Sequence, residues 1–228
     1  MIKAVISDVD GTLIDSVDAH AKAWCEAFEL FGHEIKFARM RHQIGKGADQ
    51  LIPVFLSKEE IARFGQKLEE KRAHLFQQKY LPTIRAFPKV RDLFQRLIAD
   101  GKRVVLASSA QGDELETYKR LAHIEDLVQD ETSKDDAEKS KPHPDIFKAA
   151  LKKLKGIAPA EALVLGDTPY DVTAAHRAGL ETIAVLSGGF PQEELANAGA
   201  VSIYRDPADL LANYPAWIEE KSPAAAQS

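Results

Sequence analysis

Three features of the sequence predict an α/β fold, with a Rossmann-like parallel sheet and an inserted, all-helical second unit. Short and continuously apolar runs are typical of strands buried on both faces of a sheet. Helical patterns separate these runs, and one long stretch shows helical patterns alone. The chain has 228 residues, of which 45% are hydrophobic, so it can bury a sizeable core.

The predicted strands are short runs rich in Val, Ile, Leu and Ala. Because each is apolar throughout, each is expected to be covered on both faces. The four clearest runs and one weaker candidate, which comes last, are Ala4–Ile6, Val104–Ala107, Ala162–Leu165, Thr182–Leu186 and Val201–Tyr204.

The helices expected between these strands show apolar residues at helical spacing. The clearest is Val90–Asp100, which Gly101 is suited to end. Similar patterns cover Asp145–Lys155 and Tyr170–Ala178, each followed by a glycine. Alternation of this kind is typical of a sheet whose strands are largely parallel.

The stretch from about Ser16 to Tyr80 breaks the alternation, because it contains helical patterns and no convincing strand. Val17–Phe31 is amphipathic, and Glu59–Tyr80 is long and heavily charged. We therefore expect a helical insert after the first strand. The predicted division is a core of residues 1–16 and 87–220, an insert of residues 17–86, and a frayed Ala-, Ser- and Pro-rich tail of residues 221–228.

Composition narrows the classes of partner. A formal net charge of -5 gives no electrostatic reason to expect nucleic acid or an anionic membrane. Cys25 is the single cysteine, so an internal disulfide is impossible and a reducing compartment fits best. With no long apolar segment in the sequence, a cytoplasmic protein is expected. Oligomeric state is not predicted.

Acidic residues follow two of the predicted strands. Asp8 and Asp10 come after the first, and Asp167 and Asp171 come after the strand ending at Leu165. Ligands bind at the carboxyl ends of parallel strands, and Mg²⁺ takes one or two carboxylates together with phosphate and water. The sequence thus predicts a Mg²⁺ site here. A solvated acidic turn is the ordinary alternative for one such pair, and capping of the following helix is the alternative for Asp171.

Two further segments supply groups suited to binding phosphate. Ser108 and Ser109 follow the strand that ends at Ala107, where a hydroxyl can donate to a phosphate oxygen, although each could simply cap a helix. Lys141 lies between stiffening prolines in KSKPHP and can offset repulsion between a carboxylate and a phosphate. Taken alone, it would be an ordinary surface lysine.

These motifs together resemble the haloacid dehalogenase superfamily, in its phosphatase branch. The resemblance covers nearly the whole chain, and four motifs in the right order make a chance match very improbable. The motifs are DVDGTLIDS, LASS, KSKPHPDIF and GDTPYD. The helical insert is similar to the alpha-helical cap of this family.

The resemblance implies roles for the first motif. Asp8 would attack phosphorus and bind Mg²⁺ with its other oxygen, forming an aspartyl-phosphate. Asp10 would act as general acid and then as general base, and would offer the metal its backbone carbonyl. Thr12 would orient Asp10. Dehalogenases of the superfamily lack an acid at the position of Asp10, so phosphoryl transfer is favoured over dehalogenation.

The resemblance also implies roles for the later motifs. Ser108 and Lys141 would hold the phosphate, and Asp167 would be a metal ligand. Asp171 would support Asp167 or Lys141 from behind.

The segment Gly45-Lys46-Gly47 does not have the spacing of a nucleotide-binding P-loop. In the resembled family this part of the cap reaches over the active site, so contact between Lys46 and substrate is one interpretation. A loop that merely connects two helices is the other.

The expected function is Mg²⁺-dependent hydrolysis of a small phosphorylated metabolite. A sugar phosphomutase of the beta-phosphoglucomutase type is the alternative, since that branch shares the motifs. A catalytically silent binding protein on the same fold is an alternative of another class, but it would be expected to have lost Asp8 or Asp10, and both are present.

Overall fold

A computed structural model of the chain describes residues 1–110, 112–133, 136–214 and 218. Its centre is a six-stranded sheet in the order β3-β2-β1-β4-β5-β6, and every neighbouring pair is parallel. In chain order the strands are β1 (Ala4–Ser7), β2 (Arg103–Ala107), β3 (Asp130–Thr132), β4 (Ala162–Gly166), β5 (Glu181–Val185) and β6 (Ser202–Tyr204).

The register of the central strands positions the site. Ser7, the last residue of β1, is paired with Leu106 of β2 and with Leu165 of β4. The three strands therefore end almost level with one another, and the residues that follow them leave the sheet side by side at its carboxyl end. Asp8 is the first of them on β1, and its backbone N–H donates to the carbonyl of Leu165 at 2.8 Å.

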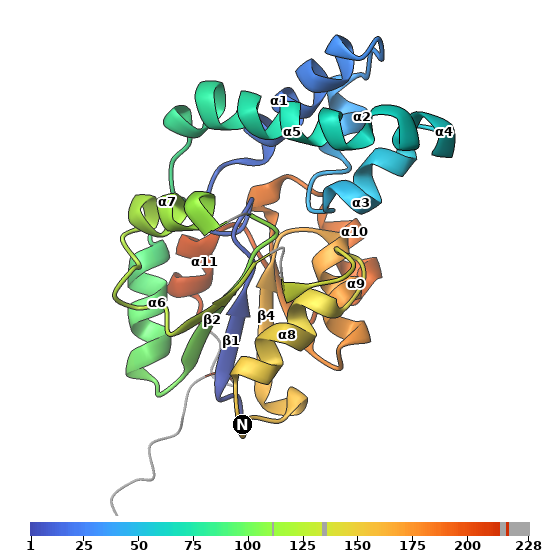
Figure 1. Cartoon of the computed structure of the whole chain (residues 1–228). Coiled ribbons are helices and arrows are strands. Elements are labelled where there is room, and N and C mark those ends of the chain that lie inside the picture. Colours follow the sequence, from blue (N-terminus) through green and yellow to red (C-terminus); the bar gives the residue numbers. More distant parts are fainter. Residues whose placement is uncertain (111, 134–135, 215–217, 219–228) are drawn as a thin grey trace, which may run out of the picture.

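Helices cover both faces of the sheet (Figure 1). Side chains alternate between the faces along a strand, so Val5 lies in one apolar cluster while Ala4 and Ile6 lie in another. The cluster of Val5 includes residues of α6 (Val90–Ala99), α7 (Gly112–Ala122) and α11 (Pro207–Ala212). The second cluster, and the smaller one beside it, are built with α8 (Asp145–Lys153), α9 (Pro169–Arg177) and α10 (Gln192–Ala198). Short 3₁₀ turns are η6 (Pro159–Glu161) and η7 (Leu186–Gly188).

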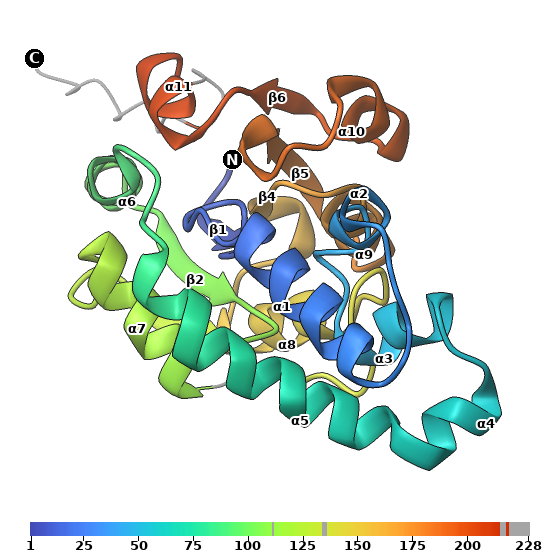
Figure 2. The same cartoon turned by 90° about the horizontal axis from the view of Figure 1, so that it is seen from above.

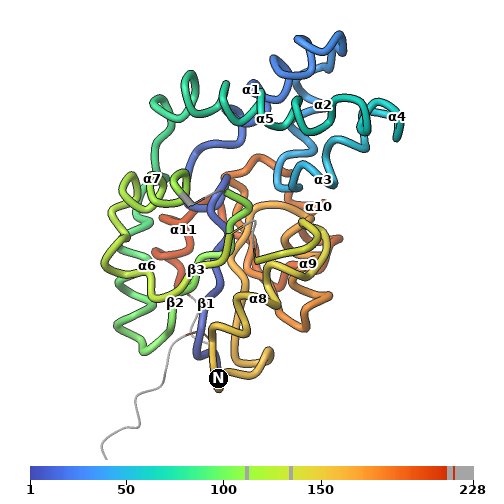
Figure 3. The backbone as a smooth tube through the Cα atoms, in the orientation of Figure 1, coloured from blue at the N-terminus to red at the C-terminus, as the bar shows by residue number. Residues whose placement is uncertain are grey.

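A helical cap lies over the carboxyl ends of the strands, and its two connections to the core are visible in Figure 3. Figure 2 shows α1 and α5 side by side over the sheet. The cap contains α1 (Val17–Leu30), α2 (Phe37–Arg41), α3 (Ala48–Leu51), η1 (Ile52–Val54), α4 (Lys58–Glu60), η2 (Ile61–Gly65), α5 (Gln66–Leu75), η3 (Phe76–Tyr80) and η4 (Leu81–Thr83).

The cap has an apolar core of its own, to which α1 contributes Trp24 and Phe28 and α5 contributes Leu68. Residues 17–86 are all described, and they contain helices but no strand. We propose that residues 17–86 are the cap and that residues 1–16 and 87–220 are the core. The tail predicted for residues 221–228 lies outside the described residues.

The predicted strands and the parallel α/β sheet are confirmed, with bounds shifted by at most one residue. The prediction was wrong in leaving out β3, which pairs with β2 at the sheet edge. Its sequence, Asp-Glu-Thr, is polar, so it lacks the apolar run that marks a buried strand. Helices α7, α10 and α11 were also not predicted. The long pattern Glu59–Tyr80 corresponds to a continuous helical run in which π-helical turns, η2 and η3, flank α5.

Candidate active site

Three buried carboxylates meet at the end of the sheet. Asp8 follows β1, Asp167 follows β4, and Asp171 lies in the first turn of α9. Each offers an oxygen, and these three oxygens all lie within 4.8 Å of one another. The site therefore gathers negative charge where water cannot screen it.

Lys141 supplies the opposite charge. Its side chain is 2% exposed, and its ammonium forms ion pairs with Asp8 Oδ1 and, at 2.7 Å, with Asp171 Oδ1. Asp171 also accepts hydrogen bonds at Oδ2 from the backbone N–H of Thr168, at 3.0 Å, and from the Thr168 hydroxyl, at 2.6 Å. Asp171 is thus held on both oxygens, and it fixes Lys141 beside Asp8.

The pKa values of these groups reflect burial and mutual repulsion. Burial and the charge of Asp171 raise the pKa of Asp8 to about 7, against the lowering influence of Lys141. Burial and the charge of Asp8 raise the pKa of Asp167 well above its usual range. Burial alone would lower the pKa of Lys141, but Asp171 and Asp8 raise it above its ordinary value. The three carboxylates thus carry more negative charge than the single ammonium of Lys141 can neutralise.

The donor set fits a hard divalent cation. Asp167 Oδ2 is buried and has no hydrogen-bond partner among the described residues. A Cβ atom on either Gly11 or Gly188 would collide with the Asp167 carboxylate. Glycine at these two positions therefore leaves room for that carboxylate. Oxygen ligands are those that Mg²⁺ prefers. We propose that Asp8 and Asp167, with the backbone carbonyl of Asp10, would hold the ion.

Thr12 does not contact Asp10, which the sequence analysis expected it to orient. Its buried hydroxyl lies 2.8 Å from Asp167 Oδ1 and 3.2 Å from Asp8 Oδ2. The turn after β1 directs the side chain of Thr12 toward the metal carboxylates. Residue spacing within one turn did not reveal which of several nearby acids the hydroxyl would reach.

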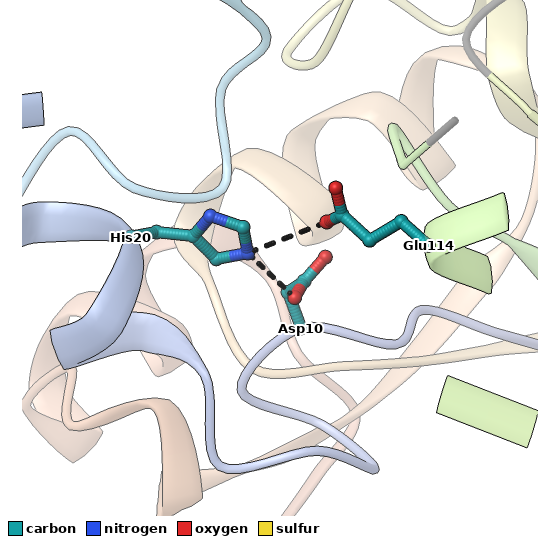
Figure 4. Close-up of side chains that lie close together, drawn as sticks. All are labelled: Asp10, His20 and Glu114. Atoms are coloured by element: carbon teal, nitrogen blue, oxygen red, sulfur yellow. Dashed lines mark hydrogen bonds and ion pairs between the residues drawn. The ribbon is translucent and has the colours of Figure 1, made fainter. Parts of the chain in front are cut away.

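Asp10 is held instead by two residues that the sequence analysis did not select. The Ser16 hydroxyl donates to Asp10 Oδ1 at 2.5 Å, and His20 Nε2 lies 2.9 Å from the same oxygen. Figure 4 shows His20 of α1 and Glu114 of α7 pointing toward Asp10, and His20 Nε2 is 3.8 Å from Glu114 Oε1. A helical cap residue and a core helix thus meet at Asp10.

Tyr118 completes this second cluster. Its hydroxyl donates to Glu114 Oε1 at 2.8 Å and lies 3.2 Å from His20 Nε2. The imidazole of His20 also stacks on Phe76, with ring centroids 3.9 Å apart. Burial would raise the pKa of Asp10, but the charge and hydrogen bond of His20 and the hydrogen bond from Ser16 hold it below its usual value. Asp10 is therefore an ionised carboxylate in a fixed position.

The predicted phosphate ligands differ in their exposure. Ser108 is fully buried, and its hydroxyl accepts the N–H of Ala110 at 3.0 Å. Ser109 lines a cavity of about 850 Å³ between cap and core, and Asp8, Asp10 and Lys141 line it too. Ser109 thus faces the cavity, whereas Ser108 does not line it, and a role of either serine in binding phosphate stays a proposal.

Lys46 lies on the cap side of the same cavity. Its ammonium donates to Gln43 Oε1 at 2.6 Å and lies 4.6 Å from the centre of the Tyr170 ring. Burial lowers its pKa. The lysine thus faces the site from the cap while its charge is already shared with neighbouring groups, and a role in binding substrate stays a proposal.

The comparisons with known proteins agree with this geometry. The model of the haloacid dehalogenase-like hydrolase family matches residues 2–179. The chain belongs to that family. It is 30% identical over 222 residues to a phosphoglycolate phosphatase of Rhodospirillum rubrum, covering 92% of this chain and 90% of that one.

Two further relatives extend the comparison. A phosphorylated carbohydrates phosphatase of Thermotoga maritima is 26% identical over 218 residues, which cover 92% of this chain and 97% of that one. The crystal structure of a hydrolase from Pseudomonas syringae is 30% identical, with a TM-score of 0.83, and the match covers 93% of this chain and 97% of that one. Among the described residues, no helix has the length and apolar character needed to cross a membrane.

Binding of Mg²⁺ should weaken as the pH falls through about 7. The raised pKa values of Asp8 and Asp167 mean that protons compete with the ion for the same oxygens. For each proton that Mg²⁺ must displace, its affinity should fall about tenfold for every pH unit below the pKa of that carboxyl group. Calorimetry in two buffers of different ionisation enthalpy would measure the affinity and the protons released.

Asp126→Asn serves as the control for this measurement, because it removes a carboxylate that pairs with Arg91 on the surface. It should leave the pH dependence unchanged. An affinity of the wild-type protein that stays constant from about pH 6 to about pH 8 would contradict the assignment of the buried carboxylates.

Proposed function

We propose that this chain hydrolyses small phosphomonoesters with Mg²⁺ through a phosphorylated Asp8. The observation that carries the proposal is the buried ion pair of Asp8 with Lys141, next to the unpartnered oxygen of Asp167. A carboxylate held in this way is a positioned nucleophile, and the surrounding charges are arranged for an anionic group. The family match and the phosphatase names of the relatives support the same class of reaction.

The first step forms a bond between a carboxylate oxygen of Asp8 and phosphorus while the ester oxygen departs. Lys141 and Thr12 fix the Asp8 carboxylate, so its approach is set before substrate binds. Ser109 and Lys141 both line the cavity, and they would bind the phosphoryl oxygens. When bound, Mg²⁺ would neutralise the charge shared by the carboxylates and the phosphate.

Asp10 is the proposed general acid of the first step and the general base of the second. It gives a proton to the departing ester oxygen, and in the second step it takes a proton from the water that attacks phosphorus. This second attack frees Asp8 and releases phosphate, so the site returns to its first state. His20 Nε2 lies 2.9 Å from Asp10 Oδ1, so the imidazole and the carboxyl are within reach for exchange of a proton.

The proposed mechanism also requires the cap to lie against the core. His20 belongs to α1 of the cap, whereas Glu114 and Tyr118 belong to α7 of the core. Asp10 therefore contacts His20 only when cap and core are together. In this arrangement the cap also covers the cavity, which limits the entry of water to the site.

Asp8→Asn should abolish phosphate release from p-nitrophenyl phosphate, because the amide is a poor nucleophile. Asp10→Asn should keep the nucleophile but lose proton transfer, and kcat should fall by about 10²–10⁴-fold. Asp15→Asn is the matched control, since it removes an exposed acid from the same turn, and it should behave as wild type. Phosphate release would be followed with Mg²⁺, with EDTA, and after Mg²⁺ is restored.

Wild-type rates in Asp8→Asn, or full activity in EDTA, would overturn the proposed mechanism. The same assay separates hydrolase from phosphomutase. Conversion of β-glucose 1-phosphate to glucose 6-phosphate with a bisphosphate primer, and with negligible phosphate release, would favour the mutase instead. Failure to turn over any phosphate ester would favour the catalytically silent binding protein.

Removing the groups that hold Asp10 should lower kcat more than it raises KM. Loss of the Tyr118 hydroxyl in Tyr118→Phe removes one hydrogen bond near His20, and a loss of about tenfold in kcat is expected. His20→Ala should cost more, and the double variant should resemble His20→Ala, because both changes act through the same contact.

Tyr204→Phe is the control for this series, since Tyr204 lies in β6, across the sheet from the site. It should retain wild-type kinetics. A folded Tyr118→Phe protein with unchanged kcat, or effects of the two substitutions that simply multiply, would show that Tyr118 does not act through His20.

A further inference from the structure

The cavity between cap and core is larger than a phosphoryl group requires. Its volume is about 850 Å³, and Asp8, Asp10 and Lys141 lie at the core side. Pockets of several hundred cubic ångströms hold ligands of the size of a sugar or larger. The part of the cavity beneath the cap is therefore room for the leaving group of the ester, and its lining indicates what that group is.

One face of α5 forms the cap wall of this cavity. Gln66, Glu70, Ala73 and Gln77 all line it. They are spaced by three or four residues, so they lie along one side of the helical run. The Gln66 amide donates to Glu70 Oε1 at 2.9 Å. Within this run the cavity lining thus offers two amides, which both donate and accept hydrogen bonds, and two carboxylates, Glu69 and Glu70, which accept them, beside Arg72 and His74.

The charges around the leaving-group part of the cavity are mainly negative. Apart from Asp8 and Asp10, four carboxylates line the cavity, against two Lys or Arg side chains besides Lys141. The carboxylates are Glu69, Glu70, Asp113 and Glu114, and the cations are Lys46 and Arg72. A second anionic group on the substrate would lie among like charges, whereas hydroxyl groups would find acceptors.

Each of the two cations has a contact within the protein, but the buried Nε of Arg72 has no hydrogen-bond partner among the described residues. Lys46 donates to Gln43 at 2.6 Å and lies over the ring of Tyr170. The guanidinium of Arg72 lies over the ring of Trp24, 5.0 Å from its centroid. Binding an anion at Lys46 would therefore compete with its hydrogen bond to Gln43. Trp24 is itself 4% exposed, so among the described lining residues it gives no open aromatic face on which a nucleobase could stack.

We propose that the preferred substrates are monophosphates of sugars or polyols, whose leaving group is uncharged and carries several hydroxyls. Phosphorylated carboxylic acids and compounds with a second phosphate are disfavoured by the carboxylates of the cavity. The proposal rests on the proposed function and goes further, because the relatives carry substrate names of both kinds.

Matched pairs of substrates test the inference directly. Sorbitol 6-phosphate and 6-phosphogluconate differ by a terminal CH₂OH in place of a carboxylate, and glycerol 3-phosphate and 3-phosphoglycerate differ in the same way. The alcohol of each pair should have a kcat/KM at least about tenfold higher, as expected for a like charge placed near carboxylates. Equal values, or a preference for the carboxylates, would overturn the inference.

Reversing a charge on the cap wall is a second test of the inference. Glu70→Lys should raise kcat/KM for 6-phosphogluconate relative to sorbitol 6-phosphate and so reduce the ratio. Glu59→Lys makes the same change of charge in α4, outside the cavity lining, and should leave the ratio as in wild type. A ratio that Glu70→Lys does not move, or that Glu59→Lys moves equally, would contradict a role for the wall.

Binding to the inactive Asp8→Asn protein separates this inference from the proposed function. Thermal stabilisation by each member of a pair, in Mg²⁺, reports binding without turnover. If wild type releases no phosphate even from p-nitrophenyl phosphate, the proposed function is wrong, while the binding comparison still decides the class of ligand. Stronger stabilisation by sorbitol 6-phosphate supports the inference, and equal or stronger stabilisation by 6-phosphogluconate refutes it.

Discussion

The ammonium of Lys141, buried between Asp8 and Asp171, is the interaction on which the site depends. A buried charge is tolerated only when it is paired and hydrogen-bonded, and Lys141 satisfies this condition with two carboxylates at once. Asp167 adds a third carboxylate that no described cation neutralises by direct contact. This excess of negative charge makes the site suited to a divalent cation, and it supports the proposal that Mg²⁺ assists the binding of an anionic group.

The parallel sheet makes this concentration of charge possible. Because Ser7 is paired with both Leu106 and Leu165, the residues after β1, β2 and β4 emerge together. The core thus supplies the chemistry of phosphate, and the cap supplies His20 and the wall of α5. In the proposed mechanism, most of the catalytic groups belong to the core, the cap adds His20 and the cavity wall, and both require the cap to lie against the core.

Features local to the sequence could be predicted, whereas features that arise from tertiary contacts could not. Central strands such as β1 and β4 are continuously apolar, so the sheet and the positions of Asp8 and Asp167 followed from pattern. The edge strand β3 is polar and gave no such signal. His20 lies on an amphipathic helix, where only its approach to Asp10 in space distinguishes it from a core residue.

Chemical trapping of the phosphorylated enzyme tests the central claim most directly. Asp10→Asn should slow the attack of water, so the phosphoryl group should accumulate on the protein during turnover of a good phosphomonoester. Borohydride reduces an acyl phosphate, and peptide mapping by mass spectrometry then locates the reduced residue. The account predicts that Asp8 carries the modification and that EDTA prevents it. Modification of another residue, or phosphate release under these conditions with no modified aspartate at all, would contradict it.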